Sequence, residues 1–339
     1  MMRPNLPIAG LFALLAFTSS GFALTAEEID GAEFSGGSLS EGPDPLVAKL
    51  QILLDRKNAS PGVIDGYPGE NVDKALRAFE AMNDLQADGK LDEEVWAALV
   101  GTGGPVTMSY TITEDDLSSL VEEIPEDYSR MADMDHLGHV SMEEKLAERF
   151  HMDIEFLKTL NPDADFSSAG TEIVVAAPGD DADREVSRIE VDKQQAQLRA
   201  YDSDGKIIAA YPVTVGSDQL PSPSGTHEVV AVALEATYSY QPDENFQQGN
   251  NDEPLTLPAG PNNPVGGIWI DLSEPTYGLH GTPEPALIDK TQSHGCVRMT
   301  KLGCPGTRWH GGTGHDGRFR RRLVRVWLFS TYASRPVSA

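Results

Sequence analysis

The stretch Ser293-His294-Gly295-Cys296-Val297-Arg298-Met299 joins a cysteine to a preceding His-Gly pair and a nearby arginine. A second histidine stands sixteen residues before the cysteine, in Tyr277-Gly278-Leu279-His280-Gly281. Cys296 is the only cysteine of the first 303 residues. The thiolate is the reactive form of cysteine, and a nearby histidine with backbone N–H groups can lower the thiol pKa. The two segments therefore predict an activated cysteine nucleophile; a buried structural cysteine is the alternative.

The sequence around this motif has the pattern of a mostly β domain. Residues 197–201 and 207–215 flank the turn Asp202-Ser203-Asp204-Gly205, which is typical of a hairpin. Further strands are predicted over 225–232 and 268–272. Seven prolines between residues 221 and 264 punctuate the connections. Long irregular loops of this kind are able to enclose a cleft.

Five segments of this region resemble the L,D-transpeptidase (YkuD-type) catalytic domain, which we place at residues 186–300. They are IEVDKQQAQLRAYDSDGKIIAAYPVTVGS, SPSGTHEV, GPNNPVGGIWIDL, YGLHGTPEP and SHGCVRM. The resemblance implies that Cys296 is the nucleophile and His280 the general base. It further implies that the Gly281 backbone carbonyl orients the His280 ring, and that the Gly295 and Cys296 amides form an oxyanion hole.

The resemblance also implies roles for the neighbouring side chains. His294 would shape the pocket or assist proton transfer; a structural hydrogen-bonding role is the alternative. Arg298 is suited to a substrate carboxylate. Ser293 and Tyr277 complete the expected substrate-binding residues.

The implied reaction has two steps and requires no metal or cofactor. Cys296 attacks the amide before the terminal D-Ala of a tetrapeptide stem, releases D-Ala and forms a thioester. An amine of a second stem then resolves the thioester and creates a cross-link. Water as acceptor would make the protein an L,D-carboxypeptidase, and a lysine of an outer-membrane lipoprotein would make it an anchoring enzyme. A non-catalytic wall-binding protein is the alternative of another class.

Residues 45–100 predict a small three-helix unit, with apolar stripes separated by the turn Pro61–Gly69 and a second Asp-Gly turn. The segment VIDGYPGENVDKALRAFEAMNDLQADGKLDEEVWAAL resembles the peptidoglycan-binding domain type 1. This resemblance implies peptidoglycan as the partner.

Residues 131–180 predict a small α+β segment, with two short helices followed by a strand. LAERFHMDIEFLKTLNP and the closing IVVAAP resemble a lysin motif (LysM), although Gly138-His139-Val140-Ser141-Met142 replaces the usual Gly-Asp-Thr-Leu opening. Residues 24–44 and 101–130 are poor in large apolar groups and are interpreted as linkers. The predicted fold class is therefore a multidomain chain.

The N-terminus predicts export. Arg3, the apolar run Leu6–Phe17 and Gly21-Phe22-Ala23 indicate a signal peptide over 1–23, with an uncleaved anchor as the alternative. No later stretch reaches the ~18 apolar residues that a membrane span needs. The formal net charge of −27 argues against nucleic acid and anionic lipid as partners. We expect a periplasmic protein associated with the cell wall.

Residues 301–339 carry a net charge of +7 and depart from the family pattern, which continues with Asn-Trp-Asp, a helix and a closing strand. The stretch KLGCPGTRWHGG can be encoded so that deleting one base near codon 301 yields N-W-D-A-R-E-L-A-G-M-V-G. We therefore interpret 301–339 as an anomalous basic tail created by a frameshift; a genuine tail that binds polyanionic wall polymer is the alternative. The domain would then lack its last helix and strand, although 323–329 could supply a replacement strand. Cys304 belongs to this tail, and a Cys296–Cys304 disulfide is the alternative to a free thiol.

Overall fold

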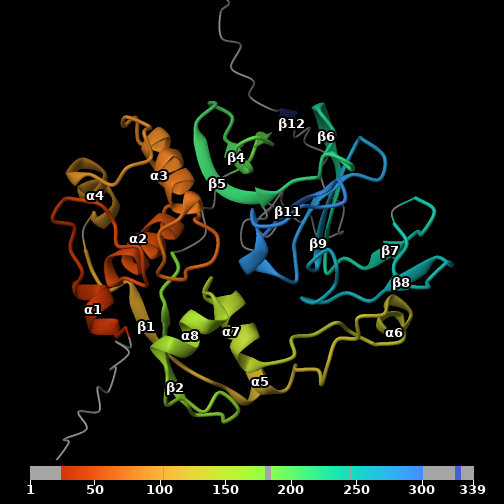
Figure 1. Cartoon of the computed structure of the whole chain (residues 1–339), viewed down its shortest axis with the longest axis horizontal. Coiled ribbons are helices and arrows are strands. Elements are labelled where there is room, and N and C mark those ends of the chain that lie inside the picture. The colour runs from red at the N-terminus through yellow and green to blue at the C-terminus, as the bar shows by residue number, and fades with distance from the viewer. Residues whose placement is uncertain (1–23, 102, 180–184, 245, 301–324, 330–339) are drawn as a thin grey trace, which may run out of the picture.

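A computed structural model of the chain describes residues 24–101, 103–179, 185–244, 246–300 and 325–329. The predicted signal peptide, Cys304 and most of the tail lie outside these residues. Helices gather in the N-terminal half and strands in the C-terminal half (Figure 1). Within the described part of the chain, no helix combines the length and apolarity needed to cross a membrane.

The N-terminal helices are α1 (Ala26–Gly31), α2 (Pro45–Arg56), α3 (Glu70–Met82) and α4 (Glu93–Val100). Asp44 sets the start of α2, because its carboxylate accepts from the Leu46 and Val47 amides while Pro45 occupies the first turn. The apolar face of α3 is buried against α2 through Val72, Leu76 and Phe79.

Two segments interpreted as linkers are instead packed against the N-terminal core. Leu24 and Ile29 are buried in it, and Lys49 donates from its ammonium to the Asp30 and Ala32 carbonyls at 2.9 and 2.6 Å. In the second segment, residues 107–111 form a strand. A few apolar anchors and buried polar bonds are enough to fix segments whose overall composition is polar.

The next unit is a two-stranded antiparallel sheet, in which β1 (Thr107–Thr111) pairs with β2 (Glu172–Ala176). Helices α7 (Met142–Arg149) and α8 (Ile154–Leu160) lie between these strands in sequence and cover them. Leu146, Leu157 and Ile173 belong to the same buried cluster as α2 and α3. The two short helices α5 (Glu114–Leu117) and α6 (Tyr128–Ala132) come from the β1–α7 connection.

The C-terminal half is mostly β, as predicted, and forms a closed barrel in the order β10-β11-β5-β4-β3-β12-β6-β9. A separate hairpin, β7–β8, projects from it (Figure 1). The strands are β3 (Arg188–Asp192), β4 (Gln197–Tyr201), β5 (Ile207–Thr214), β6 (Gly225–Leu234), β7 (Tyr238–Tyr240), β8 (Leu255–Leu257), β9 (Ile268–Leu272), β10 (Gly278–His280), β11 (Val297–Met299) and β12 (Arg325–Phe329).

Strand β12 is the replacement strand that was predicted within 323–329. It pairs in parallel with β3 and antiparallel with β6, so the barrel does not lack a closing strand. Val326 and Leu328 are buried in the barrel core, whereas Arg325 and Trp327 point outward. This alternation is the period-two pattern that a half-buried strand requires.

Candidate active site

Strands β10 and β11 unite the two halves of the cysteine motif. They pair in parallel, with Leu279 opposite Val297 and His280 opposite Arg298. Parallel neighbours require a crossover connection. Here residues 281–296 provide it, and they include the 3-10 turn η1 (Pro285–Leu287). The sixteen-residue spacing therefore places both motif halves side by side in the barrel.

Cys296 precedes β11 and is half-buried. Its Sγ donates to the Thr276 carbonyl at 3.8 Å. Burial raises the pKa of the thiol, against the opposing effects of a Gly278 backbone hydrogen bond and the Arg298 charge. The motif predicts a lowered thiol pKa, but desolvation outweighs the stabilising groups in the resting structure. The resting sulfur is therefore a protonated thiol that needs a base.

His280 has the tautomer and protonation state of such a base. Its Nδ1 lies 2.6 Å from the Gly281 carbonyl oxygen, so Nδ1 carries the proton and Nε2 is left as an acceptor. The ring is buried and stacks on Trp269. Burial and then the Arg298 charge lower the pKa of His280 to about 4, although the Gly281 bond opposes this shift. The imidazole is consequently neutral at physiological pH.

The loop before Cys296 is held in a conformation that only glycine adopts easily. Gly295 has φ +119°, and a Cβ there would lie 2.8 Å from the Tyr277 ring. The Gly295 amide donates to Ser293 Oγ at 3.1 Å, and that hydroxyl donates to the Cys296 carbonyl. In the resting structure, buried Ser293 therefore braces the loop, and its hydroxyl takes up the Gly295 amide. The Cys296 amide is left as the candidate oxyanion donor.

His294 lies at the surface of the site. Its ring stacks on Phe246, with centroids 4.4 Å apart and planes 12° from parallel. Burial and then the Arg298 charge lower its pKa. The structure thus gives His294 an aromatic partner that the sequence motif did not indicate.

Arg298 supplies the positive charge of the site. Among the described residues, no carboxylate forms an ion pair with it. An unpaired guanidinium beside a thiol suits an anionic substrate group, because it can bind a carboxylate through two parallel hydrogen bonds.

Two tyrosines that the sequence motifs do not indicate lie near Arg298. Burial raises the pKa of both Tyr128 and Tyr238; the Arg298 charge opposes this shift in each, and Cys296 adds to it in Tyr238. The alternation Tyr238-Ser239-Tyr240 could have indicated a strand face. Tyr128 carries no local signal, because it enters from the N-terminal half of the chain.

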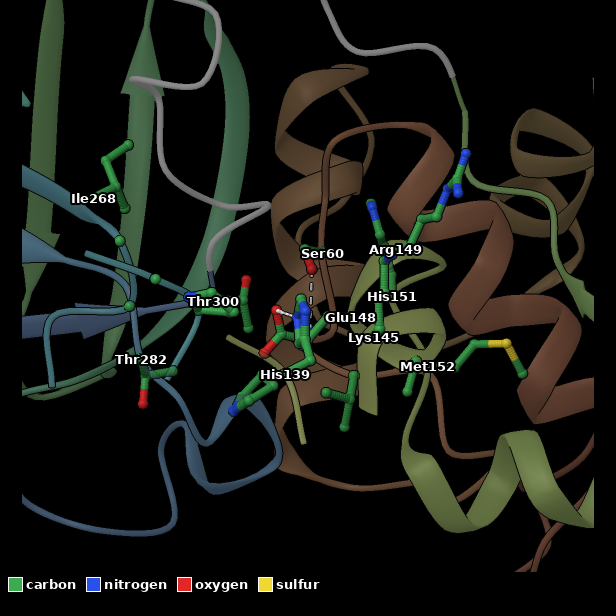
Figure 2. Close-up of a pocket in the computed structure, with 18 of the residues that line it drawn as sticks. Ser60, His139, Lys145, Glu148, Arg149, His151, Met152, Ile268, Thr282 and Thr300 are labelled. Atoms are coloured by element: carbon green, nitrogen blue, oxygen red, sulfur yellow. Dashed lines mark hydrogen bonds and ion pairs between the residues drawn. The ribbon is translucent and has the colours of Figure 1, made fainter. Parts of the chain in front are cut away.

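A separate cavity of about 500 Å³ lies between the helical units and the barrel. Ile268, Thr282 and Thr300 line its barrel side, while Arg149, His151 and Met152 lie opposite (Figure 2). Its histidines are paired with carboxylates: His151 with Asp55 at 2.7 Å and His139 with Glu148 at 3.1 Å. Cys296 and His280 are not among the lining residues.

Two family models match the chain. The L,D-transpeptidase catalytic domain matches residues 187–302, and a family described as "Putative peptidoglycan binding domain" matches residues 43–99. Both predicted domains are thereby confirmed, whereas the LysM resemblance of 131–180 stays a prediction.

Curated relatives carry similar descriptions. The "Putative L,D-transpeptidase YkuD" of Bacillus licheniformis is 30% identical over 159 residues, which cover 46% of this chain and 79% of that protein. The "Probable L,D-transpeptidase ErfK/SrfK" of Escherichia coli is 25% identical over 161 residues, or 46% of this chain and 52% of that protein. The chain thus spans about half the length of the E. coli protein.

Solved structures of similar proteins include an Enterococcus faecium L,D-transpeptidase, with 21% identity, a TM-score of 0.29 and coverage of 46% of this chain and 55% of that chain. An L,D-transpeptidase from Mycobacterium smegmatis has 15% identity and a TM-score of 0.31, with 48% and 65% covered.

Proposed function

Because the chain belongs to the YkuD family of L,D-transpeptidases, we propose that it is a cysteine transpeptidase that cross-links peptidoglycan stem peptides. The observation that supports this most directly is the bond between His280 Nδ1 and the Gly281 carbonyl. It leaves Nε2 of a neutral imidazole as the proton acceptor, on the strand next to Cys296. A base in this state is what a protonated thiol nucleophile requires.

In the first proposed step, Cys296 Sγ attacks the carbonyl carbon of the amide that precedes the terminal D-Ala. The thiol proton passes to His280 Nε2 as the S–C bond forms. The C–N bond then breaks, and the same proton moves from the imidazolium to the amine of the departing D-Ala. The hydrogen bond between thiol and imidazole forms when substrate is bound, since such contacts tighten in the reactive complex.

In the second step, the amine of another stem attacks the thioester carbonyl. His280 takes a proton from this amine and returns it to the sulfur as the S–C bond breaks. The Cys296 amide would stabilise the oxyanion of both steps, and one such donor is typically worth about 3 kcal/mol. Arg298 would hold a carboxylate of the stem, and His294 would shape the pocket.

The remaining domains would hold the enzyme on its polymeric substrate. We propose that residues 43–99 bind peptidoglycan and that 131–180 form a degenerate LysM-like segment. In support of the second proposal, α7 and α8 lie between two paired strands. We also propose a signal peptide over 1–23 and a periplasmic, wall-associated location. Pelleting of the full chain carrying Cys296→Ala with insoluble sacculi tests wall binding without turnover.

The decisive experiment incubates the purified protein with disaccharide-tetrapeptides and follows the products by mass spectrometry. We expect release of D-Ala, a covalent adduct on Cys296 and cross-linked dimers. Cys296→Ala should abolish all three, and His280→Gln should lower the rate at least about 100-fold, the usual contribution of a general base. Dimers that persist in Cys296→Ala would refute the assigned nucleophile.

The products also identify the acceptor. Free tripeptide without dimers would identify an L,D-carboxypeptidase, and transfer to a lysine peptide would identify a lipoprotein-anchoring enzyme. A folded protein that pellets with sacculi but forms no adduct would be a non-catalytic wall-binding protein.

A further inference from the structure

A segment of the N-terminal half reaches across to the active site. Residues 124–137, here called the strap, belong to the connection between β1 and α7 and include α6. Helix α6 of the strap lies against the β7–β8 hairpin (Figure 1). Together they form a separate apolar cluster, whose buried members are Met131, Leu137, Tyr240 and Leu257.

Polar bonds fasten the strap at both ends. Near its start, the Tyr128 amide donates to Gln248 Oε1 at 3.2 Å, and Gln248 Nε2 donates to the Glu126 carbonyl at 2.8 Å. At its end, the Leu137 amide donates to the Ala259 carbonyl and the Leu137 carbonyl accepts from the Asn262 amide, each at 2.9 Å. The backbone is so close there that a Cβ on Gly260 would lie 2.1 Å from the Leu137 oxygen. The strap therefore has one defined register on the hairpin.

An unbroken series of ring contacts leads from the strap to the cysteine motif. The Tyr128 ring packs edge-on against Tyr240 at 5.2 Å, Tyr238 at 6.0 Å and Phe246 at 6.3 Å between centroids. Phe246 in turn stacks on His294 at 4.4 Å. Tyr128 and Tyr238 also lie close enough to Arg298 for its positive charge to lower their pKa values against the effect of burial.

We propose that Tyr128 is a positioning residue for the peptide substrate, because it fixes the β7–β8 hairpin and, through Phe246, the His294 ring as one wall beside Cys296 and Arg298. This inference rests on the proposed transpeptidase function. It means that the barrel alone lacks one wall beside Cys296, and that the N-terminal half supplies this wall. Removal of the Tyr128 ring would loosen the wall that orients the stem, while His280 stays on β10 and Cys296 stays next to β11.

Tyr128→Ala is the principal test, with Tyr128→Phe expected to behave as wild type because the ring contacts remain. We expect Tyr128→Ala to raise KM for the tetrapeptide donor about tenfold, since several aromatic pairs are lost, with kcat changed much less. Hydrogen exchange should quicken in residues 238–257 but not in the N-terminal core. Tyr110→Ala is the matched control, because Tyr110 packs edge-on against Phe150 in the same half of the chain; it should leave KM unchanged.

Gln248→Ala provides a second route, since it removes two bonds of the strap and keeps every ring. Like Tyr128→Ala, it should raise KM and quicken hydrogen exchange in 238–257. It therefore tests the proposal even if Tyr128→Ala unfolds the protein. Unchanged KM and unchanged exchange in both variants would overturn the proposal, as would a fall in kcat alone. The exchange measurement needs no turnover, so failure of the strap and failure of the proposed transpeptidase function give different results.

Discussion

His280 occupies an environment that disfavours its charged form. The ring is buried, and Arg298 adds a repelling positive charge, so burial and then this charge lower its pKa to about 4 against the effect of the Gly281 carbonyl. Cys296 is perturbed in the opposite direction, because burial raises the pKa of its thiol. The resting pair is therefore neutral, and in the proposed mechanism its charges would develop only as the sulfur attacks.

This environment predicts the titration of His280. We expect its ring to remain neutral as the pH falls through the ordinary value of 6.5 and to take up a proton only near pH 4. Arg298→Gln should raise the pKa, because it removes a positive charge. Histidine NMR on Cys296→Ala protein measures the pKa of His280 with and without Arg298→Gln. The His280→Gln variant assigns the signal. Protonation of folded protein near 6.5 would contradict the buried, neutral base.

The residues of the motif were predicted from sequence more completely than their neighbours. Local spacing identifies Cys296 and His280, because their chemistry lies in two short segments. Hydrogen bonds inside the loop are not visible in spacing, so the use of Ser293 Oγ by the Gly295 amide was missed. Tyr128 was missed for another reason: it is far from the motif in sequence, and only the strap brings it to the site.

At the scale of elements, β12 decides whether the barrel is closed. Its five residues fill the space between β3 and β6, and they come from the tail that departs from the family pattern. Without this strand, the edges of β3 and β6 would present unpaired backbone groups, which are costly when they are buried.

Val326→Asp tests the role of β12. Val326 is 0% exposed, so a carboxylate there would lie in the barrel core, and we expect the free energy of unfolding to fall by about 4 kcal/mol. Val230→Asp makes the same change on a neighbouring strand where the valine is 54% exposed, and it should cost little. Denaturant unfolding compares the two variants. Equal stabilities would show that the barrel does not depend on β12.

Elements stabilised by local contacts were predicted from the sequence, whereas elements stabilised by distant contacts were not. The hairpin β4–β5 and strands β6 and β9 follow from local alternation and turn residues, so sequence indicated them. Strand β1 and helix α1 lie in polar segments interpreted as linkers, and each is stabilised by partners distant in sequence. The Asp30 carboxylate, for example, accepts from the Val106 amide at 2.7 Å. Composition alone does not reveal such a bond.

At the scale of the whole molecule, the peptidoglycan-binding helices are fixed to the barrel. Ala210 of β5 exchanges backbone hydrogen bonds with the Asn58–Ser60 segment and belongs to the N-terminal buried cluster. Lys74 of α3 forms an ion pair with Asp289 at 2.6 Å. Asp289 donates from its amide to Thr214 Oγ1 and stands four residues before Ser293. The domain matched as peptidoglycan-binding therefore contacts the loop that leads to Cys296.

Lys74→Met tests this contact between the domains. The Lys74 side chain is 5% exposed, and its loss would leave the Asp289 carboxylate partly buried without its cation. We expect a destabilisation of about 3 kcal/mol at neutral pH, the usual cost of breaking a buried pair. Burial already raises the pKa of Asp289 against the opposing effect of Lys74, so the variant should raise it further. The loss of stability should shrink in acid, because protonation of Asp289 then removes the unpaired charge.

Two further variants distinguish loss of the Lys74–Asp289 ion pair from the general effect of replacing a lysine. Lys90→Met removes a lysine whose side chain is 79% exposed and whose partner Asp88 lies 3.9 Å away, and it should be nearly neutral. Lys74→Met combined with Asp289→Leu should recover much of the lost stability, because no unpaired charge remains. Denaturant unfolding at neutral and acidic pH measures all three. The loss of stability could instead be the same at both pH values and persist in the double variant. That result would show that the effect comes from the packing of α3 rather than from the ion pair.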